Sequence, residues 1–262
     1  MGTDPGFYFG CDLKISLIFR LARVVLHVLM GMSICAVAFP WLGREARDGH
    51  IRHWSRKLLA VCNVTVELAP DSAPVLQQAA VVANHVSWLD IFVIHSLHPS
   101  RFVAKAEIRS WPLAGWLAEK AGTVFISRGS KRDLRHIFKG LVHSLQAGER
   151  VAFFPEGTTA AQGSLLPFHA NLFEAAIDAK APVQAMALFY LDENGGSHPS
   201  VDFIGDTTFA ESIMLILNGP PVRARLSVLA PVSTEGAHRR ELAESTHAAI
   251  AAALGVPAAM EQ

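Results

Sequence analysis

The sequence predicts an α/β protein, in which a single domain with a mostly parallel central sheet flanked by helices follows an N-terminal membrane-associated helical hairpin. Two observations support this prediction. After residue 62, short apolar stretches typical of buried strands alternate with longer stretches typical of helices. Before residue 63, a long apolar stretch is followed by a basic, amphipathic one. We therefore expect residues 1–62 to form the hairpin and residues 63–262 to form the α/β domain.

Composition limits the classes of partner. The chain has 262 residues, of which 18% are charged, below the roughly 25% of an average soluble domain, and its mean hydropathy is +0.29. Lys and Arg total 23, as do Asp and Glu, so the formal net charge is zero and we expect no nucleic acid partner. The three cysteines, Cys11, Cys35 and Cys62, are widely spaced and predict neither a disulfide framework nor a metal site.

The apolar stretch near the N-terminus predicts a membrane anchor. Residues 24–42 contain no acidic or basic residue except His27, and nineteen residues of helix span about 28 Å, close to the roughly 30 Å of a bilayer's hydrocarbon core. This length permits a single-pass helix. Arg20, Arg23 and His27 form a polar stripe at helical spacing, however, and basic residues flank both ends, which favours a monotopic helix lying in one leaflet.

A second helix completes the predicted hairpin. Pro40 and Gly43 break the first helix, and an apolar stripe then runs along a basic segment. The stripe consists of Ile51, Trp54, Leu58 and Val61. We expect the hairpin to bind anionic lipids on the cytoplasmic face of the inner membrane. Residues 36–38 also resemble the cleavage site of a secretory signal, but the arginines within the apolar stretch favour an anchor.

The rest of the chain alternates between strand and helix patterns. Strands are predicted at residues 64–68, 79–83, 101–104, 123–126, 150–154, 183–190, 201–204 and 222–229. Helices are predicted at residues 88–97, 111–121, 131–146, 171–179, 208–217 and 239–254. Because no low-complexity linker interrupts this alternation, we expect one domain.

Residues 84–90, Asn-His-Val-Ser-Trp-Leu-Asp, place a histidine and an aspartate five residues apart. An imidazole titrates near neutral pH, and a carboxylate can fix its tautomer and stabilise its charged form. Within one helix this separation would turn the two side chains to different faces. His85 falls on the turn after a strand, however, and Asp90 in the first turn of the next helix, so the two can meet. Ser87 and Asp90 also fit a capping box, which is the structural alternative.

A second segment has the character of an anion-binding turn. Residues 150–154 predict a strand that leads into Pro-Glu-Gly-Thr-Thr. Pro155 ends the pairing of the strand, Gly157 permits a positive φ, and the N–H groups that follow can form a nest for an anion. An ordinary tight turn is again the structural alternative.

The two segments together resemble a known family. The PlsC-like glycerolipid acyltransferases of the 1-acyl-sn-glycerol-3-phosphate (lysophosphatidate) type carry an Asn-His-x-Ser-x-x-Asp block, the HX4D motif, and some tens of residues later Phe-Pro-Glu-Gly-Thr. Here these blocks are residues 84–90 and 154–159, and residues 122–128 resemble the family's arginine block. The resemblance runs from about residue 64 to residue 190, within the domain of residues 63–262.

The resemblance implies an O-acyltransferase that moves a fatty acyl group from a thioester to the free hydroxyl of a lysophospholipid. The most specific reaction is conversion of 1-acyl-sn-glycerol-3-phosphate to phosphatidic acid. His85 is implied as the general base, oriented by Asp90. The donor is acyl-CoA or acyl carrier protein, and no further cofactor or metal is implied. The residues expected to bind substrate are Arg128, Glu156, Gly157, Thr158 and Lys105.

The polar residues have a common placement. His85, Lys105, Arg128 and Glu156 each follow a predicted strand, and ligands of parallel α/β sheets bind at the carboxyl ends of the strands. An acyl chain also needs an apolar groove. The large apolar side chains available for it are Trp88, Phe92, Trp111, Leu113, Trp116, Phe168, Leu172 and Phe173.

Two departures from the family's pattern weaken the assignment of the acceptor. Thr159 stands where the family often has Arg, and residues 181–186 keep one proline of the family's Val-Pro-x-x-Pro-Val block. Another lysolipid, such as lyso-ornithine lipid, is therefore an alternative acceptor. The alternatives from other classes are a thioester hydrolase and a membrane-surface protein without turnover.

Overall fold

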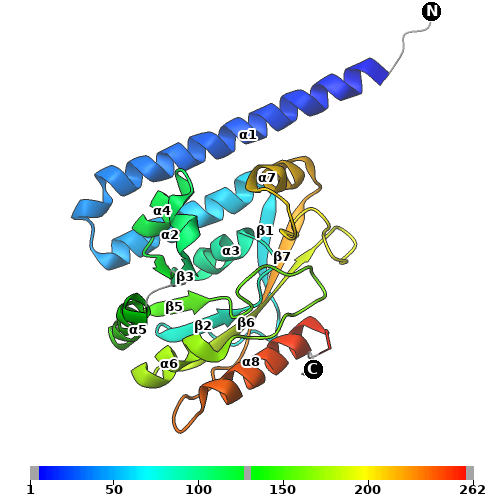
Figure 1. The fold of residues 1–262 in the computed structure, drawn as a ribbon. Helices are drawn as coiled ribbons and strands as arrows, with labels where there is room; N and C mark the ends of the chain where they lie inside the picture. Colours follow the sequence, from blue (N-terminus) through cyan, green and yellow to red (C-terminus); the bar gives the residue numbers. More distant parts are fainter. Residues whose placement is uncertain (1–5, 127–130, 258–262) are drawn as a thin grey trace, which may run out of the picture.

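The computed structural model describes residues 6–126 and 131–257, and it confirms the predicted α/β fold (Figure 1). Seven strands form one sheet in the order β1-β7-β6-β2-β5-β3-β4. The strands are β1 Val64–Leu68, β2 Ala79–Ala83, β3 Arg101–Lys105, β4 Val124–Ile126, β5 Arg150–Phe153, β6 Val183–Leu191 and β7 Val222–Val228. The helices are α1 Gly6–Val37, α2 Arg44–Val61, α3 Leu89–Leu97, α4 Ala114–Lys120, α5 Lys131–Gln146, α6 Phe173–Ala179, α7 Phe209–Asn218 and α8 Arg239–Leu254. Short 3-10 helices occupy Phe39–Trp41, Ala106–Ser110 and Ala170–Leu172.

The sheet is parallel except at one junction. β6, β2, β5, β3 and β4 all run in the same direction, β7 pairs antiparallel with β6, and β1 pairs parallel with β7. The carboxyl ends of the five parallel strands therefore lie along one edge of the sheet. This is the edge at which α/β proteins bind ligands.

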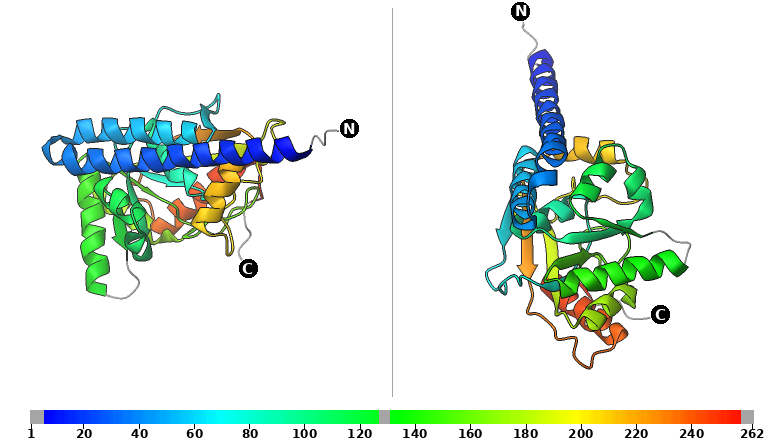
Figure 2. Two further views of the ribbon diagram at one scale, coloured as in Figure 1. Left: turned by 90° about the horizontal axis from the view of Figure 1, so that it is seen from above. Right: turned by 90° about the vertical axis from the view of Figure 1, so that its left-hand side faces the viewer.

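Helices cover both faces of the sheet, and each face has its own core (Figures 1 and 2). The buried strand β2 contributes to both, because side chains alternate across a strand: Val81 packs with residues of α1, α2, α3 and α7, whereas Val82 packs with residues of α5, α6 and α8. Both are fully buried. Because both faces of β2 are buried, its sequence is a continuous apolar run rather than an alternation of apolar and polar residues.

Helices α1 and α2 run side by side in opposite directions on the first of these faces (Figure 2). Two reciprocal hydrogen bonds join them: the ring Nε2 of His27 donates to the Trp54 carbonyl oxygen at 3.0 Å, and the Trp54 indole N–H donates to the His27 carbonyl oxygen at 3.1 Å. The two rings stack at 4.7 Å. Gly31 makes this approach possible, because a Cβ at that position would collide with the Trp54 ring.

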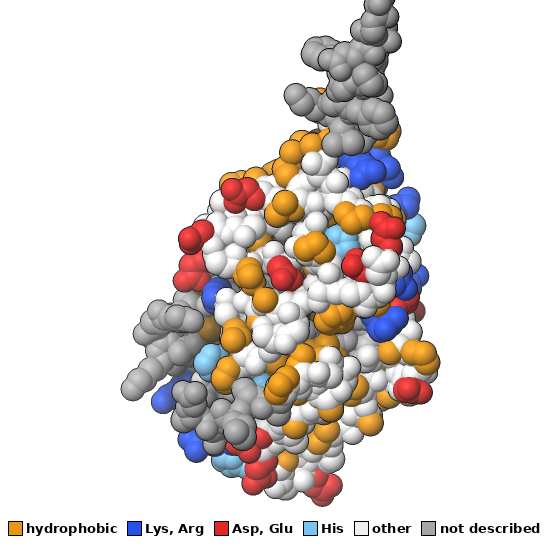
Figure 3. Space-filling model, turned by 90° about the vertical axis from the view of Figure 1, so that its right-hand side faces the viewer, with side chains coloured by type: hydrophobic (Ala, Val, Ile, Leu, Met, Phe, Trp, Pro, Cys, Tyr) orange, Lys and Arg blue, Asp and Glu red, His pale blue; other side chains and the backbone are white. Residues whose placement is uncertain are grey.

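Two residues of the predicted polar stripe of α1, Arg20 and His27, face the protein, whereas the third, Arg23, is exposed. Arg20 donates to the Leu217 carbonyl oxygen of α7 at 2.7 Å, and His27 is buried against Trp54. Turning this side inward leaves an apolar face exposed. Its large exposed residues include Ile18, Phe19, Leu21, Val25, Leu26, Leu29, Met30 and Val37, and Trp41 follows at 88% exposed. In Figure 3, apolar side chains gather at the upper end of the drawn face, next to the grey atoms.

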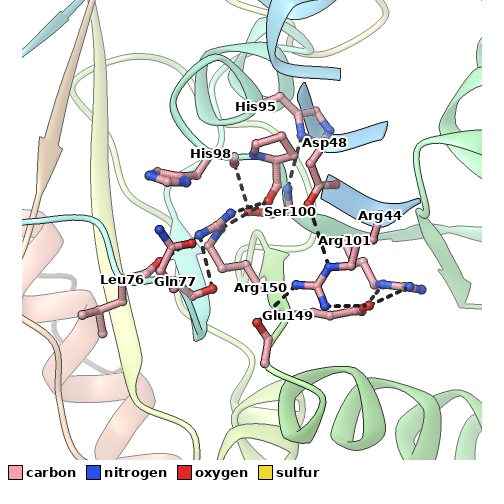
Figure 4. A network of polar contacts seen from close by, with 12 residues as sticks. Arg44, Asp48, Leu76, Gln77, His95, His98, Ser100, Arg101, Glu149 and Arg150 are labelled. Carbon is pink, nitrogen blue, oxygen red and sulfur yellow. Dashed lines mark hydrogen bonds and ion pairs between the residues drawn. The ribbon is translucent and has the colours of Figure 1, made fainter. Parts of the chain in front are cut away.

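A polar cluster lies at the amino ends of the parallel strands (Figure 4). We call it the Arg150 cluster. Arg150, which is 8% exposed, donates to the carbonyl oxygens of Pro99, Leu76 and Gln77 at 2.9 to 3.3 Å. Beside it, Glu149 forms ion pairs with Arg101 of β3 and Arg44 of α2. His95 and His98 of the α3 end complete the cluster. The cluster ties α2 to the sheet.

One predicted strand is wrong, and one predicted helix is shorter than expected. Residues 201–204 are a loop and not a strand, because the Phe203 N–H donates to the Val86 carbonyl oxygen and the Thr159 hydroxyl donates to the Phe203 carbonyl oxygen. The backbone groups that a strand would use are thus occupied by other loops. The single helix predicted at residues 111–121 is interrupted by Pro112 and by Leu113 at φ +64°, so that α4 begins only at Ala114.

Candidate active site

The His85 and Asp90 side chains meet, as their spacing predicts. β2 ends at Ala83 and α3 begins at Leu89, so His85 lies on the connecting turn and Asp90 in the first helical turn. His85 Nδ1 lies 2.7 Å from Asp90 Oδ2. Because an ionised carboxylate can only accept, Nδ1 carries the proton of a neutral ring and Nε2 keeps the lone pair.

Asp90 is fully buried and receives further hydrogen bonds. The backbone N–H groups of Val86 and Ser87 donate to the same Oδ2 at 2.7 and 3.0 Å, and the Tyr190 hydroxyl donates to Oδ1 at 2.6 Å. Several donors around one carboxylate stabilise its negative charge away from water. Sequence reasoning missed Tyr190, although a hydroxyl at the end of an otherwise apolar strand was a signal that could have identified it.

The Ser87 hydroxyl does not cap α3, which corrects the predicted capping box. Trp88 occupies the N-cap position without a side-chain bond, and the buried Ser87 hydroxyl has no partner among the described residues. The Asp90 carboxylate accepts the N–H groups ahead of the helix instead. An acidic group in the first turn is favourable there because these N–H groups have no partner within the helix.

Glu156 holds the backbone of the same turn. It follows β5, is 5% exposed, and its Oε1 accepts the His85 N–H at 2.7 Å while its Oε2 accepts the Leu166 N–H at 2.9 Å. Burial raises the pKa of Glu156, although both N–H bonds oppose this shift. The carboxylate therefore joins the turns that follow β2 and β5.

Phe154 fixes the plane of the imidazole. Its ring stacks on that of His85 with centroids 3.9 Å apart and an interplanar angle of 6°, and Phe102 stacks behind it at 5.7 Å. The His85 side chain is 19% exposed. One side of the ring is thus held by Asp90 and one face by Phe154, while part of it stays accessible to a substrate.

Comparisons with known proteins identify the family. Residues 63–188 match the sequence profile of a family described as Acyltransferase. A "Lyso-ornithine lipid O-acyltransferase" of Pseudomonas aeruginosa is 36% identical over 259 residues, which cover 95% of this chain and 97% of that protein. The chain belongs to this acyltransferase family. The predicted resemblance is confirmed, and the protein is an acyltransferase enzyme.

Two further relatives extend the comparison. A "1-acyl-sn-glycerol-3-phosphate acyltransferase" of Neisseria meningitidis is 45% identical over 151 residues, which span 58% of this chain and 59% of that protein. A solved structure of the 1-acyl-sn-glycerophosphate (LPA) acyltransferase of Thermotoga maritima has a TM-score of 0.64 with 21% identity, covering 90% of this chain and 96% of that chain. At this identity the likeness shows a shared fold.

Three of the other predicted site residues of the acyltransferase lie along the same edge of the sheet: Gly157, Thr158 and Lys105. Gly157 follows Glu156 with the predicted positive φ, +69°, and Thr158 is exposed. Lys105 is exposed at the carboxyl end of β3, which neighbours β5. Arg128 lies outside the described residues. Among the predicted site residues that the structure describes, hydrogen bonds thus join His85 to Asp90 and to Glu156.

The apolar residues offered for an acyl groove do not form one lining. Trp88, Phe92 and Trp111 belong to an aromatic cluster with Phe209 of α7, on the α3 side of the sheet. Phe168, Leu172 and Phe173 pack in the core on the opposite face. The predicted region was wrong as a single set, because helical spacing does not show which face of the sheet a helix covers.

Over residues 6–126 and 131–257, no group of three or more His, Cys, Asp or Glu side chains is placed to hold a metal ion. His85 and Asp90 contact each other through the hydrogen bond between Nδ1 and Oδ2.

Proposed function

We propose that this acyltransferase moves a fatty acyl group from acyl-CoA or acyl carrier protein to the free hydroxyl of a lysolipid, with His85 as general base and Asp90 as the carboxylate that orients it. The observation that supports this proposal is the 2.7 Å contact between His85 Nδ1 and Asp90 Oδ2. It leaves Nε2 as the atom that accepts a proton. The reaction needs no cofactor besides the thioester.

The proton transfer follows from this arrangement. As His85 Nε2 takes the acceptor's hydroxyl proton, the oxygen attacks the carbonyl carbon of the thioester and forms a tetrahedral intermediate. Asp90 stabilises the imidazolium that results. The carbon–sulfur bond then breaks, the ester is released, and the proton on Nε2 passes to the departing thiolate. Since the acceptor itself is the nucleophile, the enzyme forms no covalent intermediate.

The turn after β5 has two proposed roles. Glu156 holds the His85 backbone, and we assign its contribution to substrate binding through that contact. The Gly157 N–H donates to the Phe154 carbonyl oxygen at 3.1 Å and so shapes the turn, and Thr158, which is exposed, presents its N–H for the acceptor's anion. From the family resemblance we assign the phosphate itself to the Arg128 guanidinium, with Lys105 as a second cation at the same edge of the sheet.

The primary acceptor is 1-acyl-sn-glycerol-3-phosphate, which gives phosphatidic acid. The higher identity to the Neisseria meningitidis relative, 45% over 151 residues against 36% over 259 for the Pseudomonas aeruginosa relative, supports this choice. A lyso-ornithine lipid is the second candidate. The Pseudomonas aeruginosa relative matches along almost the whole chain, and Thr159 uses its hydroxyl to bond Phe203 at a position where an arginine would add a phosphate contact.

Residues 1–62 form the proposed membrane-binding hairpin and residues 63–262 the acyltransferase domain. Residues 17–41 make the one helical stretch, among the described residues, that is long and apolar enough to cross a bilayer. Its exposed apolar face points away from the domain, and the inward bonds of Arg20 and His27 hold it there. We assign this face to one leaflet on the cytoplasmic side of the inner membrane, as a monotopic anchor, with a single-pass helix as the alternative.

A reconstituted assay tests the enzymatic proposal. The purified full chain is incubated in mixed micelles with an acyl thioester and either 1-acyl-sn-glycerol-3-phosphate or a lyso-ornithine lipid. We expect His85→Ala to lower acyl transfer by about 10³-fold while vesicle binding is unchanged. His143→Ala, which removes an exposed histidine near the end of α5, is the matched control.

Each alternative has its own signature in that assay. Product formed only from the phosphate-free acceptor would contradict the role of Arg128 and favour the second candidate. Free fatty acid released at one rate with and without acceptor would identify a thioester hydrolase. Wild-type activity in His85→Ala would refute the proposed mechanism.

A further inference from the structure

Tyr190 is a buried polar group next to the reacting pair, and neither motif of the family contains it. It lies on β6, is fully buried, and donates its hydroxyl to Asp90 Oδ1 at 2.6 Å. His85 contacts the other oxygen, Oδ2. The carboxylate of Asp90 is therefore held between a phenol on one side and an imidazole on the other.

The register of the sheet places Tyr190 there. β2 ends at Ala83, which pairs with Met186, so β6 continues past it and Tyr190 lies four residues farther along. Asn84 extends the pairing with its side chain, since its Oδ1 accepts the Leu188 N–H at 2.7 Å and its Nδ2 donates to the Leu188 carbonyl oxygen at 3.0 Å.

Gln162 fixes the residue itself. Its Oε1 accepts the Tyr190 N–H at 2.7 Å. Because β2 ends at Ala83, the side chains of Asn84 and Gln162 bond backbone groups of β6 that have no partner on β2. The first residue of the Asn-His block, Asn84, helps to define where the Tyr190 hydroxyl lies.

We propose that Tyr190 is a positioning residue that sets the orientation and the basicity of the Asp90–His85 pair. This inference rests on the proposed acyl transfer. The hydroxyl holds the carboxylate so that Oδ2 faces Nδ1, and it shares the negative charge that would otherwise act on the imidazole alone. Without it, the carboxylate holds the imidazolium more strongly, so His85 binds its proton more tightly and becomes neutral only at higher pH.

The titratable groups around the His85 imidazole come from three elements. Asp90 belongs to α3, Tyr190 to β6, and Glu156, whose oxygens both accept backbone N–H groups, to the turn after β5. His169 lies against Gly157 in that same turn. Burial and the negative charge of Asp90 raise the pKa of Tyr190 well above its ordinary value. Tyr190 therefore stays a donor at every pH at which the enzyme is assayed.

Tyr190→Phe tests this role because it removes the oxygen and keeps the ring. We expect kcat to fall about tenfold with KM unchanged, as for loss of one hydrogen bond to a charged group. We also expect the acidic limb of the pH profile of kcat/KM to move up by about half a pH unit. Ser212→Ala is the matched control, since it removes another buried hydroxyl, the one that accepts the Trp88 indole N–H at 3.0 Å.

A second variant reverses the sign of the effect. The chain has two tyrosines, so Tyr8→Phe leaves Tyr190 alone, and this variant can be produced with 3-fluorotyrosine. A more acidic phenol donates more strongly to Asp90, so we expect the acidic limb to move down. The fluorinated residue keeps its hydroxyl, which makes this measurement independent of whether Tyr190→Phe folds.

The outcomes separate this inference from the proposed function. If His85→Ala is inactive while Tyr190→Phe and the fluorinated protein keep the wild-type acidic limb, Tyr190 has only a structural role and the inference is wrong. If His85→Ala retains activity, the proposed function and this inference are both wrong. Shifts of opposite sign in the two Tyr190 proteins, with no shift in Ser212→Ala, would establish the positioning role.

Discussion

The two ends of strand β5 differ in the kind of polar network that they support. At its amino end Arg150 is surrounded by carbonyl oxygens, and its neighbour Glu149 pairs with Arg101 and Arg44. Beyond its carboxyl end, Glu156 and the adjacent Asp90 are surrounded by N–H and O–H donors. The first network is a cation held by acceptors, and the second consists of anions held by donors.

The difference lies in what each network leaves free. Arg150 uses its guanidinium on three carbonyl groups that precede β2 and β3, so it closes the loops at that end. The carboxylates of the other network are equally well bonded, but they hold an imidazole that remains 19% exposed at its side chain. The network around Arg150 thus stabilises the fold, whereas the network around Asp90 and Glu156 also holds an imidazole that stays partly accessible.

The largest effect is expected for Asp90→Asn. The amide keeps the shape of the carboxylate but removes the charge, and it no longer selects the His85 tautomer with the proton on Nδ1. We expect kcat to fall by about 10³- to 10⁴-fold. Steady-state kinetics in mixed micelles measure this value, and a decrease below about tenfold would contradict the assigned role of Asp90.

Arg150→Met tests the opposite network through stability. It leaves several buried carbonyl groups without a donor, so we expect the free energy of unfolding to fall by about 3 kcal/mol with kcat unchanged. Urea denaturation followed by circular dichroism measures the change. Arg225→Met is the matched control, because Arg225 pairs with Glu67 at the surface with a 46% exposed side chain and should cost less than about 1 kcal/mol. An equal loss of unfolding free energy in the two variants would show that the Arg150 cluster stabilises the fold no more than a surface ion pair does.

Acid should weaken the same cluster. Burial and the nearby Arg150 lower the pKa of His95 from 6.5 to about 3, so the folded protein keeps this ring neutral while the unfolded chain protonates below pH 6.5. Stability from this group is present above pH 6.5 and is lost as the pH falls, by about 2 kcal/mol at pH 5. Urea midpoints at pH 7.5 and pH 5 measure it, and we expect His95→Leu to show a smaller difference between them. If the urea midpoint changes equally between the two pH values in wild type and variant, His95 is not the source of the loss of stability in acid.

The smallest effect is expected for Glu156→Gln, and it distinguishes two roles. The side-chain amide can accept only one of the His85 and Leu166 N–H groups with its oxygen, so the turn that carries His85 loosens. We expect kcat to fall about tenfold at constant KM, the equivalent of one hydrogen bond. If KM rises instead while kcat is retained, Glu156 contacts the acceptor directly.

Local spacing predicted the contact between His85 and Asp90, because few backbone paths join residues 85 and 90. A strand followed by a helix leaves one short turn between them, and that turn brings the imidazole to the carboxylate. The loop at residues 201–204 shows the limit of such reasoning. Its apolar residues fit a strand, yet its backbone bonds to Val86 and Thr159, which are remote in sequence.

The sequence by itself determined the alternation of strands and helices, the placement of polar residues after strands and the family to which the chain belongs. The tertiary structure alone decided which donors surround the carboxylates. Glu156 reaches His85 across 71 residues and Tyr190 reaches Asp90 across 100. Such contacts depend on which strands become neighbours and in what register, and register is decided by packing of the whole sheet rather than by any local pattern.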